Sequence, residues 1–228
     1  EDLRLKWFDH FLKGMKTDVL DGDPIQIFIM GGGTGKCDLD GRMAHGGHWR
    51  TEKKWPIIGA SSVDYFLHAN GILDIQRPIS DDESSQFTFD PEDPVPTIGG
   101  CVQNPKMQGV LAGGAFDQIG RPELFFACKN DMPLEYRQDV LVFQTDPLEE
   151  DIEVTGFVEV RLFASSSAVD TDFTAKLLDV CPANDDYPNG FAMNLCDGII
   201  RGRYRLGREK SVLMERGEIS EFKISLQA

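Results

Sequence analysis

Two aspartates and three arginines form the most chemically promising charged group in this sequence. Asp170 and Asp172 precede a run that holds Arg201, Arg203 and Arg205. Residues two apart on a strand point to the same face, so the three arginines are expected to lie on one face of a strand. A guanidinium can bind a carboxylate through two parallel hydrogen bonds. The pattern predicts either a buried ion-pair network that fixes a sheet or its interface, or a solvated sheet face that adds little stability.

A glycine-rich run at residues 31–36, GGGTGK, invites a nucleotide-binding interpretation. A P-loop needs glycine five residues before its Gly-Lys pair, where this chain has Met30. The dinucleotide fingerprint needs a third glycine where Lys36 stands. The run is therefore interpreted as a flexible loop, and no cofactor is expected.

The same stretch contains Cys37, His45 and His48, which are residue types that bind zinc. A structural zinc site needs a fourth ligand, and no convincing Cys or His pair follows. Residues 38–41, DLDG, resemble the opening of a calcium loop but lack its later glutamate. No metal site is predicted.

A self-contained catalytic triad is not expected, and no catalytic residue is assigned. Serine hydrolases carry their nucleophile in G-x-S-x-G, and this pentapeptide does not occur. The serines at 165–167 follow a strand pattern with no helical pattern behind it. The four histidines, at positions 10, 45, 48 and 68, cannot be matched to a nucleophile and an orienting carboxylate.

The elements that must position these residues are mostly strands. The first dozen residues predict a helix, because Leu3, Trp7 and Phe11 recur at helical spacing, and Gly14 ends it. Residues 31–60 are expected to form a long polar loop. Strands are expected at residues 25–30, 63–68, 86–89, 140–144, 152–164, 173–180, 191–195, 199–205 and 218–226.

No helical pattern joins these strands, so they are expected to pair antiparallel in a sandwich or jelly roll. The net charge of −15 disfavours nucleic acid and anionic membranes as partners. No apolar run is long enough to span a bilayer. Five scattered cysteines predict reduced, mostly buried thiols and a cytoplasmic protein.

Several motifs, in order and nearly end to end, resemble the cocaine-esterase-like (CocE/NonD) hydrolase family. Residues 90–100, DPEDPVPTIGG, are similar to that family's DPxDPVPxxGG string, and residues 137–141 match its RxDVL. The most specific match is EVTG at 153–156 followed by residues 165–177. The remaining matches are residues 7–14, 27–31, 49–56, 196–199 and 203–205.

The resemblance implies a C-terminal segment of a serine hydrolase that cleaves ester or amide bonds through an acyl-enzyme. It implies a mainly β fold: an antiparallel, galactose-binding-like jelly roll after a short linker helix, without a complete α/β-hydrolase domain. Residues 1–60 are expected to be linker helix, strand and tryptophan loop, and residues 61–228 a jelly roll truncated at its C-terminal end. The triad would lie in an N-terminal α/β-hydrolase domain of the same parent protein.

The resemblance also implies that the segment after Gly100 approaches the substrate pocket, beginning Cys101, Val102, Gln103 and Asn104. The segment would shape the pocket for a small ester or amide and stabilise the catalytic domain. A role in homo-oligomer assembly is compatible with this interpretation. The alternative is a stand-alone carbohydrate- or ligand-binding jelly roll with an aromatic platform from Trp49, Trp55 and Tyr65.

Overall fold

The computed structural model describes residues 2–79, 84–101, 113–120 and 132–227. The chain divides into two compact units, each described by itself below. The first consists of Glu1–Ser62 and Glu150–Gly156, and the second of Val63–Glu149 and Phe157–Ala228. Each unit is therefore built from two separate stretches of sequence.

The first unit contains helix α1 (Asp2–Lys13) and a hairpin of two antiparallel strands, β1 (Ile25–Ile29) and β2 (His48–Glu52). The helix ends as predicted, with Gly14 in the left-handed region at φ 66°. The glycine-rich run lies in the loop that joins β1 to β2. A Cβ on Gly33 would overlap the carbonyl oxygen of Ala44, so this loop depends on the close approach of two backbones.

Residues 150–156 join the first unit through an ion pair. The guanidinium of Arg50 on β2 donates two hydrogen bonds to the carboxylate of Glu153, at 2.8 and 2.9 Å. These bonds lower the pKa of Glu153. The predicted strand at 152–164 is therefore wrong in its first half. Gly156, at φ 127°, breaks the extended run, and β5 starts only at Val158.

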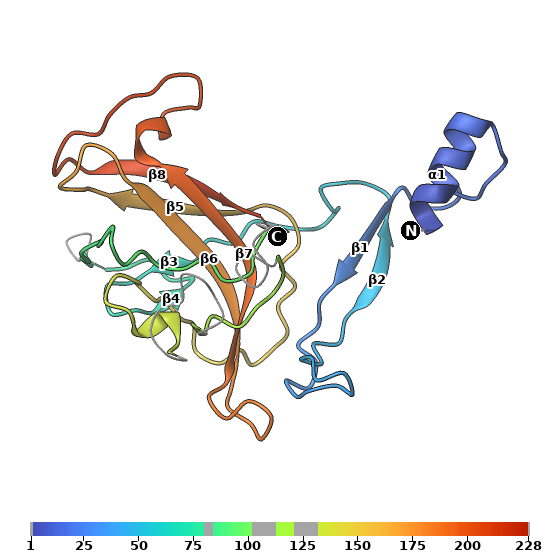
Figure 1. Cartoon of the computed structure of the whole chain (residues 1–228), viewed down its shortest axis with the longest axis horizontal. Helices are drawn as coiled ribbons and strands as arrows, with labels where there is room; N and C mark the ends of the chain where they lie inside the picture. The colour runs from blue at the N-terminus through green and yellow to red at the C-terminus, as the bar shows by residue number, and fades with distance from the viewer. Residues whose placement is uncertain (1, 80–83, 102–112, 121–131, 228) are drawn as a thin grey trace. The chain divides into compact units, whose positions relative to one another are not determined.

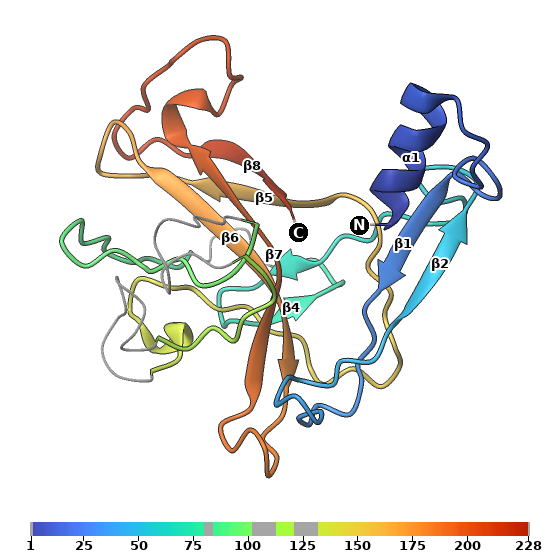
Figure 2. The ribbon, with the colours of Figure 1, turned by 45° about the vertical axis from the view of Figure 1, so that its right-hand side comes forward.

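The second unit is built around four longer strands. Strand β5 (Val158–Ala164) pairs antiparallel with β8 (Ser220–Leu226). Strands β6 (Asp172–Cys181) and β7 (Phe191–Arg201) form a long antiparallel ribbon, which is seen in both Figure 1 and Figure 2. Shorter elements surround them: β3 (Phe66–Leu67), β4 (Leu73–Asp74), and the 3-10 turns η1 (Leu134–Tyr136) and η2 (Gly202–Tyr204).

The core of the second unit lies where β8 meets the β6–β7 ribbon. Alternate residues of β8 are buried, and Phe222 and Ile224 are 0% and 1% exposed. Phe222 packs against Phe173 of β6 with ring centroids 4.5 Å apart. A Cβ on Gly198 of β7 would overlap the backbone oxygen of Ser225, so glycine is needed there for the two strands to pack.

The mainly β, antiparallel sandwich predicted from the sequence is confirmed, with several strand boundaries corrected. Residues 191–195 and 199–205 do not form two strands: the first run continues to Arg201, and η2 follows. Residues 86–89 lie in no strand, and the stretch 140–144 contributes only a parallel bridge between Gln144 and Ile72. In the part of the chain that the structure describes, no helix is long and apolar enough to cross a membrane.

Candidate functional site

The charged group predicted from the sequence separates into two ion pairs and a third, unrelated arginine. Arg201 donates two hydrogen bonds to Asp172, at 2.8 and 2.9 Å. Arg203 lies 3.4 Å from Asp170 and also donates its backbone N–H to that carboxylate. Arg205 instead donates to the carbonyl oxygens of Gly202 and Val212, which closes the turn after β7.

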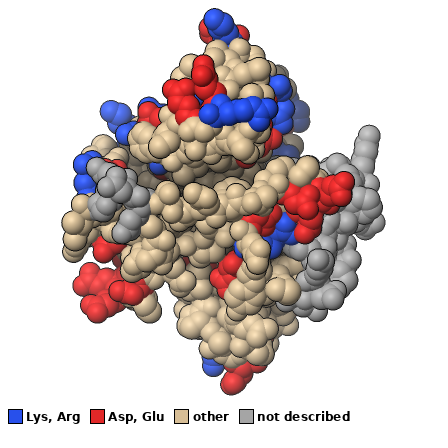
Figure 3. Space-filling model, turned by 90° about the vertical axis from the view of Figure 1, so that its left-hand side faces the viewer, with Lys and Arg blue, Asp and Glu red and all other residues tan. Residues whose placement is uncertain are grey.

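The expectation that the three arginines share one strand face is wrong, because β7 ends at Arg201. The Arg201 and Asp172 side chains are 48% and 34% exposed. Figure 3 shows acidic and basic side chains next to one another on one face of the molecule. Exposed pairs of this kind gain little net free energy, because water screens them and ordering two side chains costs entropy.

Replacing Asp172 with alanine is therefore expected to lower the free energy of unfolding by less than about 1 kcal/mol. Asp172→Asn, which keeps the shape and removes the charge, serves as the control. Urea denaturation of the three proteins measures the difference. A loss of several kcal/mol would show that the pair acts as a buried network.

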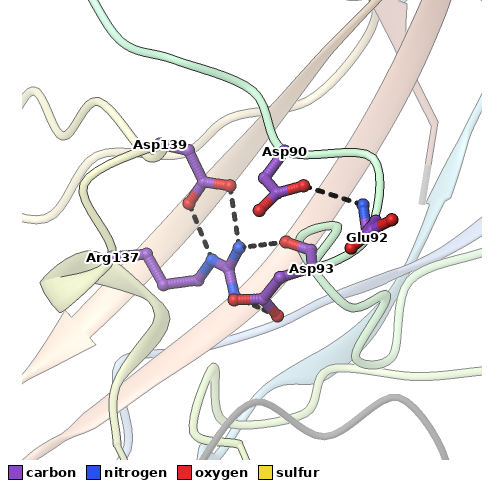
Figure 4. Close-up of polar contacts among 5 residues, drawn as sticks. All are labelled: Asp90, Glu92, Asp93, Arg137 and Asp139. Carbon is purple, nitrogen blue, oxygen red and sulfur yellow. Dashed lines mark hydrogen bonds and ion pairs between the residues drawn. The ribbon is translucent and has the colours of Figure 1, made fainter.

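The DPEDPVPTIGG segment has a strong anchor at its beginning. Arg137, just after η1, donates two hydrogen bonds to Asp139 at 2.7 and 2.8 Å. The same guanidinium donates to the backbone oxygen of Asp93 at 2.6 Å and contacts its carboxylate at 3.3 Å. Figure 4 shows Arg137 between the two acidic residues. Because the Arg137 and Asp139 side chains are only 14% and 9% exposed, this pair is shielded from water.

The end of the same segment is fixed by backbone pairing and by a buried amide. Gly100 forms a two-way antiparallel bridge with Gly114, with N–H to oxygen distances of 2.8 and 3.0 Å. The side-chain amide of Gln118, 4% exposed, donates to the carbonyl oxygens of Ile98 and Phe116, both at 3.0 Å. The turn at Gly99 and Gly100 is therefore held on both sides, with both glycines at positive φ.

A polar cluster on the β6–β7 ribbon lies beside this turn. Lys176 of β6 is paired in register with Asp197 of β7, and its ammonium donates to the Gln118 oxygen at 2.6 Å. Burial lowers the pKa of Lys176, while the negative charge of Asp197 opposes that shift. The Asp197 carboxylate accepts from the amide of Asn194 at 3.4 Å and from the Cys101 thiol at 3.5 Å.

A β-bulge makes this cluster possible. The register of β6–β7 shifts between Leu177 and Leu178. Leu177 pairs with Cys196 and Leu178 pairs with Asn194, so Leu195 is an extra residue on β7. Residues three apart on a regular strand point to opposite faces. The extra residue brings Asn194 to the same face as Asp197, which allows their hydrogen bond. We name Lys176, Asp197, Asn194 and Gln118 the ribbon cluster.

The pocket-facing segment predicted from the sequence lies only partly within the described residues. Cys101 is exposed, and its side chain contacts Asp197 of the ribbon cluster. Partial desolvation and, after it, the hydrogen bond to Asp197 raise the pKa of the Cys101 thiol. Val102, Gln103 and Asn104 lie outside the described residues, so their role stays a prediction.

Other residues considered for chemistry have structural contacts. The ring of His45 packs edge-on against Phe28, and a ring nitrogen of His68 lies 3.0 Å from the carbonyl oxygen of Gln76. The expectation of mostly buried cysteines is wrong for the described thiols, since Cys37 and Cys101 are exposed. Within the described residues, no group of three or more His, Cys, Asp or Glu side chains could hold a metal ion.

Comparisons with known proteins find relatives that are named as an esterase, an aminopeptidase and an ester hydrolase. It is 37% identical to cocaine esterase of a Rhodococcus species, over 97% of this chain and 34% of that protein. An aminopeptidase from a marine sediment Thaumarchaeota archaeon matches 98% of this chain and 33% of its own, with a TM-score of 0.67 and 27% identity. An α-amino acid ester hydrolase matches 99% of this chain and 34% of its own, with a TM-score of 0.69 and 27% identity.

The chain thus spans about a third of the length of these relatives. A family model, the X-Pro dipeptidyl-peptidase C-terminal non-catalytic domain, matches residues 18–228. The resemblance to cocaine-esterase-like hydrolases inferred from the motifs is confirmed, and the matched domain is non-catalytic. This chain belongs to the family of X-Pro dipeptidyl-peptidase C-terminal non-catalytic domains.

Proposed function

We propose that this chain is the C-terminal, non-catalytic part of a serine hydrolase that cleaves ester or amide bonds through an acyl-enzyme. The observation that carries the proposal is the match of nearly the whole chain to one third of cocaine esterase. An N-terminal α/β-hydrolase domain of the same polypeptide would supply the nucleophile, base and oxyanion hole. In this proposal residues 61–228 form a jelly roll, and residues 1–60 link it to that domain.

The apolar surface of the first unit supports packing against another domain. Helix α1 has no buried residue, and the apolar side chains on it are 49–76% exposed: Leu3, Leu5, Trp7, Phe8, Phe11 and Leu12. A helix in a folded protein usually buries one apolar face, so this many exposed apolar side chains on one helix point to a surface that another domain covers. We infer that the hydrolase domain covers α1, and that burying these side chains stabilises both parts of the polypeptide.

The second part of the proposed role is to shape the substrate pocket. Arg137 anchors the start of the DPEDPVPTIGG segment, and Gln118 and Gly114 anchor its end. A backbone held at both ends holds the Gly99–Gly100 turn and Cys101 in one position, which favours a defined pocket wall at that turn. We propose that the segment starting at Cys101 forms one side of the acyl pocket.

A comparison of this chain with its parent polypeptide tests the proposal. With p-nitrophenyl esters of short acids, the chain alone is expected to give no turnover above buffer. The parent polypeptide is expected to hydrolyse them and to lose that activity to a serine-directed organophosphate. Inhibitor-sensitive turnover by the chain alone, or a parent that is inert to esters and amides, would contradict the proposal.

A binding module is the second candidate, because aromatic side chains are exposed in the first unit. Trp49 is 64% exposed and packs edge-on against Phe28, and Trp55 is 41% exposed. Exposed rings of this kind can stack on sugars. Binding of the isolated chain to a glycan array, lost in Trp49→Ala, would favour this function over the pocket role.

A further inference from the structure

The ribbon cluster lies directly beside the turn that begins the proposed pocket wall. A Cβ on Gly100 would overlap a carboxylate oxygen of Asp197, so the backbone of the turn rests against that side chain. The other carboxylate oxygen of Asp197 accepts the hydrogen bond from the Cys101 thiol. Asp197 therefore contacts two consecutive residues of the turn, one through its backbone and one through its side chain.

Asp197 is in turn held by its own neighbours. Its backbone pairs in both directions with Gln227, at 2.8 and 3.0 Å, which ties this point of β7 to the end of β8. The amide of Asn194, 2% exposed, donates to its carboxylate, and the ammonium of Lys176 provides a positive charge across the ribbon. The position of this carboxylate is therefore fixed from several directions.

We propose that Asp197 is a positioning residue, which fixes the Gly100–Cys101 turn so that the parent hydrolase can bind its substrate against that turn. This inference rests on the proposed function, since it assigns to Asp197 a share in the pocket role of that same segment. Asp197 does not touch the reacting atoms. Its removal is therefore expected to weaken substrate binding and to leave the bond-making steps largely unchanged.

The local contact can be tested on this chain without any enzymatic activity. In a Cys37→Ser background, the rate of iodoacetamide labelling at Cys101 is measured against pH, and the labelled peptide is identified by mass spectrometry. Asp197→Asn removes the negative charge beside the thiol, so the pKa of Cys101 should fall and labelling near pH 8 should quicken about threefold or more. Asp172→Asn, the same change in the exposed pair of the same ribbon, should leave the rate unchanged.

Lys176→Gln is a second, independent variant that tests the same contact, and it replaces Asp197→Asn if that variant does not fold. Removing the cation leaves the Asp197 carboxylate less neutralised, so the pKa of Cys101 should rise and labelling should slow. Opposite shifts in the two variants support the contact. If Cys101 is labelled at the same rate in Asp197→Asn as in the Cys37→Ser background, the contact between Asp197 and Cys101 is overturned. If only Lys176→Gln folds, a labelling rate equal to that of the background overturns the contact in the same way.

The effect of Asp197 on substrate binding is measured in the parent polypeptide, as KM and kcat for a p-nitrophenyl ester. Asp197→Asn is expected to raise KM about tenfold and to change kcat by less than about twofold. A lower kcat at unchanged KM, or no change in either, would overturn the positioning role even if the labelling results hold. A parent without ester or amide hydrolysis would instead contradict the proposed function, and the labelling experiment would still decide whether Asp197 holds the turn.

Discussion

Replacing Arg137 with methionine is expected to lower the free energy of unfolding by about 3–5 kcal/mol. Methionine fills much of the volume but leaves the Asp139 carboxylate, only 9% exposed, without its cation. It also removes the donor to the backbone oxygen of Asp93. An uncompensated buried charge is costly because the interior solvates it poorly. Urea denaturation near pH 7 measures the loss.

Arg161→Met is the matched control, since Arg161 pairs with Glu221 while its side chain is 58% exposed. That change is expected to lower stability by less than about 1 kcal/mol. If the two variants lose equal stability, the Arg137 anchor is no stronger than an exposed ion pair.

The Arg137 variant should also respond differently to acid. The hydrogen bonds from Arg137 lower the pKa of Asp139 in the folded protein, so their stabilisation is complete above the unfolded pKa of about 3.9. It is lost as the pH falls through the lower, folded pKa. In the variant burial still raises the pKa of Asp139, opposed by the smaller effect of a backbone hydrogen bond, and protonation then relieves the unpaired charge. The difference between wild type and variant should narrow as the pH falls towards about 4.

Gly100→Ala is expected to lower stability by about 2–5 kcal/mol, from two separate causes. Gly100 has φ 79°, and a non-glycine residue in this region costs about 1–2 kcal/mol. The new methyl group would also overlap the Asp197 carboxylate, and overpacking costs about 1–3 kcal/mol. Chemical denaturation of the variant measures the total loss in the free energy of unfolding from both causes.

Two further variants separate the causes. Gly217 has φ 75°, and a Cβ added to it would meet no other atom within 4 Å, so Gly217→Ala should show the backbone cost alone. In an Asp197→Ala background the overlap disappears, so Gly100→Ala should cost less there than in the wild type. Strict additivity of the two changes would show that the turn does not rest on Asp197.

The sequence predicted the regular elements where one pattern dominated. Helix α1 is predicted because its apolar residues recur at helical spacing. Strand β8 is predicted to within two residues of its observed start, and its alternate residues are buried. The sequence predicts two strands where the structure has the single strand β7, because the turn residues Asp197 and Gly198 lie between the two apolar runs. In the structure Gly198 instead allows β8 to approach closely, which is a tertiary requirement that local propensity does not contain.

The ribbon cluster could not be predicted from the sequence. Its polar residues come from three separate segments, and the contact between Asn194 and Asp197 depends on a β-bulge that no local motif marks. The Arg137 anchor was closer to prediction. Arg137 and Asp139 belong to one sequence motif, and Asp93 belongs to another. Opposite charge was the available signal that could have joined the two.

The division of the first unit between Glu1–Ser62 and Glu150–Gly156 has a consequence for synthesis on the ribosome. Strands β1 and β2 can pair once Glu52 has emerged, but Glu153, the partner of Arg50, lies 103 residues after Arg50 in the chain. At about 5–20 residues per second, that partner follows roughly 5–20 s later. The nascent hairpin must therefore persist with an incomplete set of contacts while most of the next unit is still being translated.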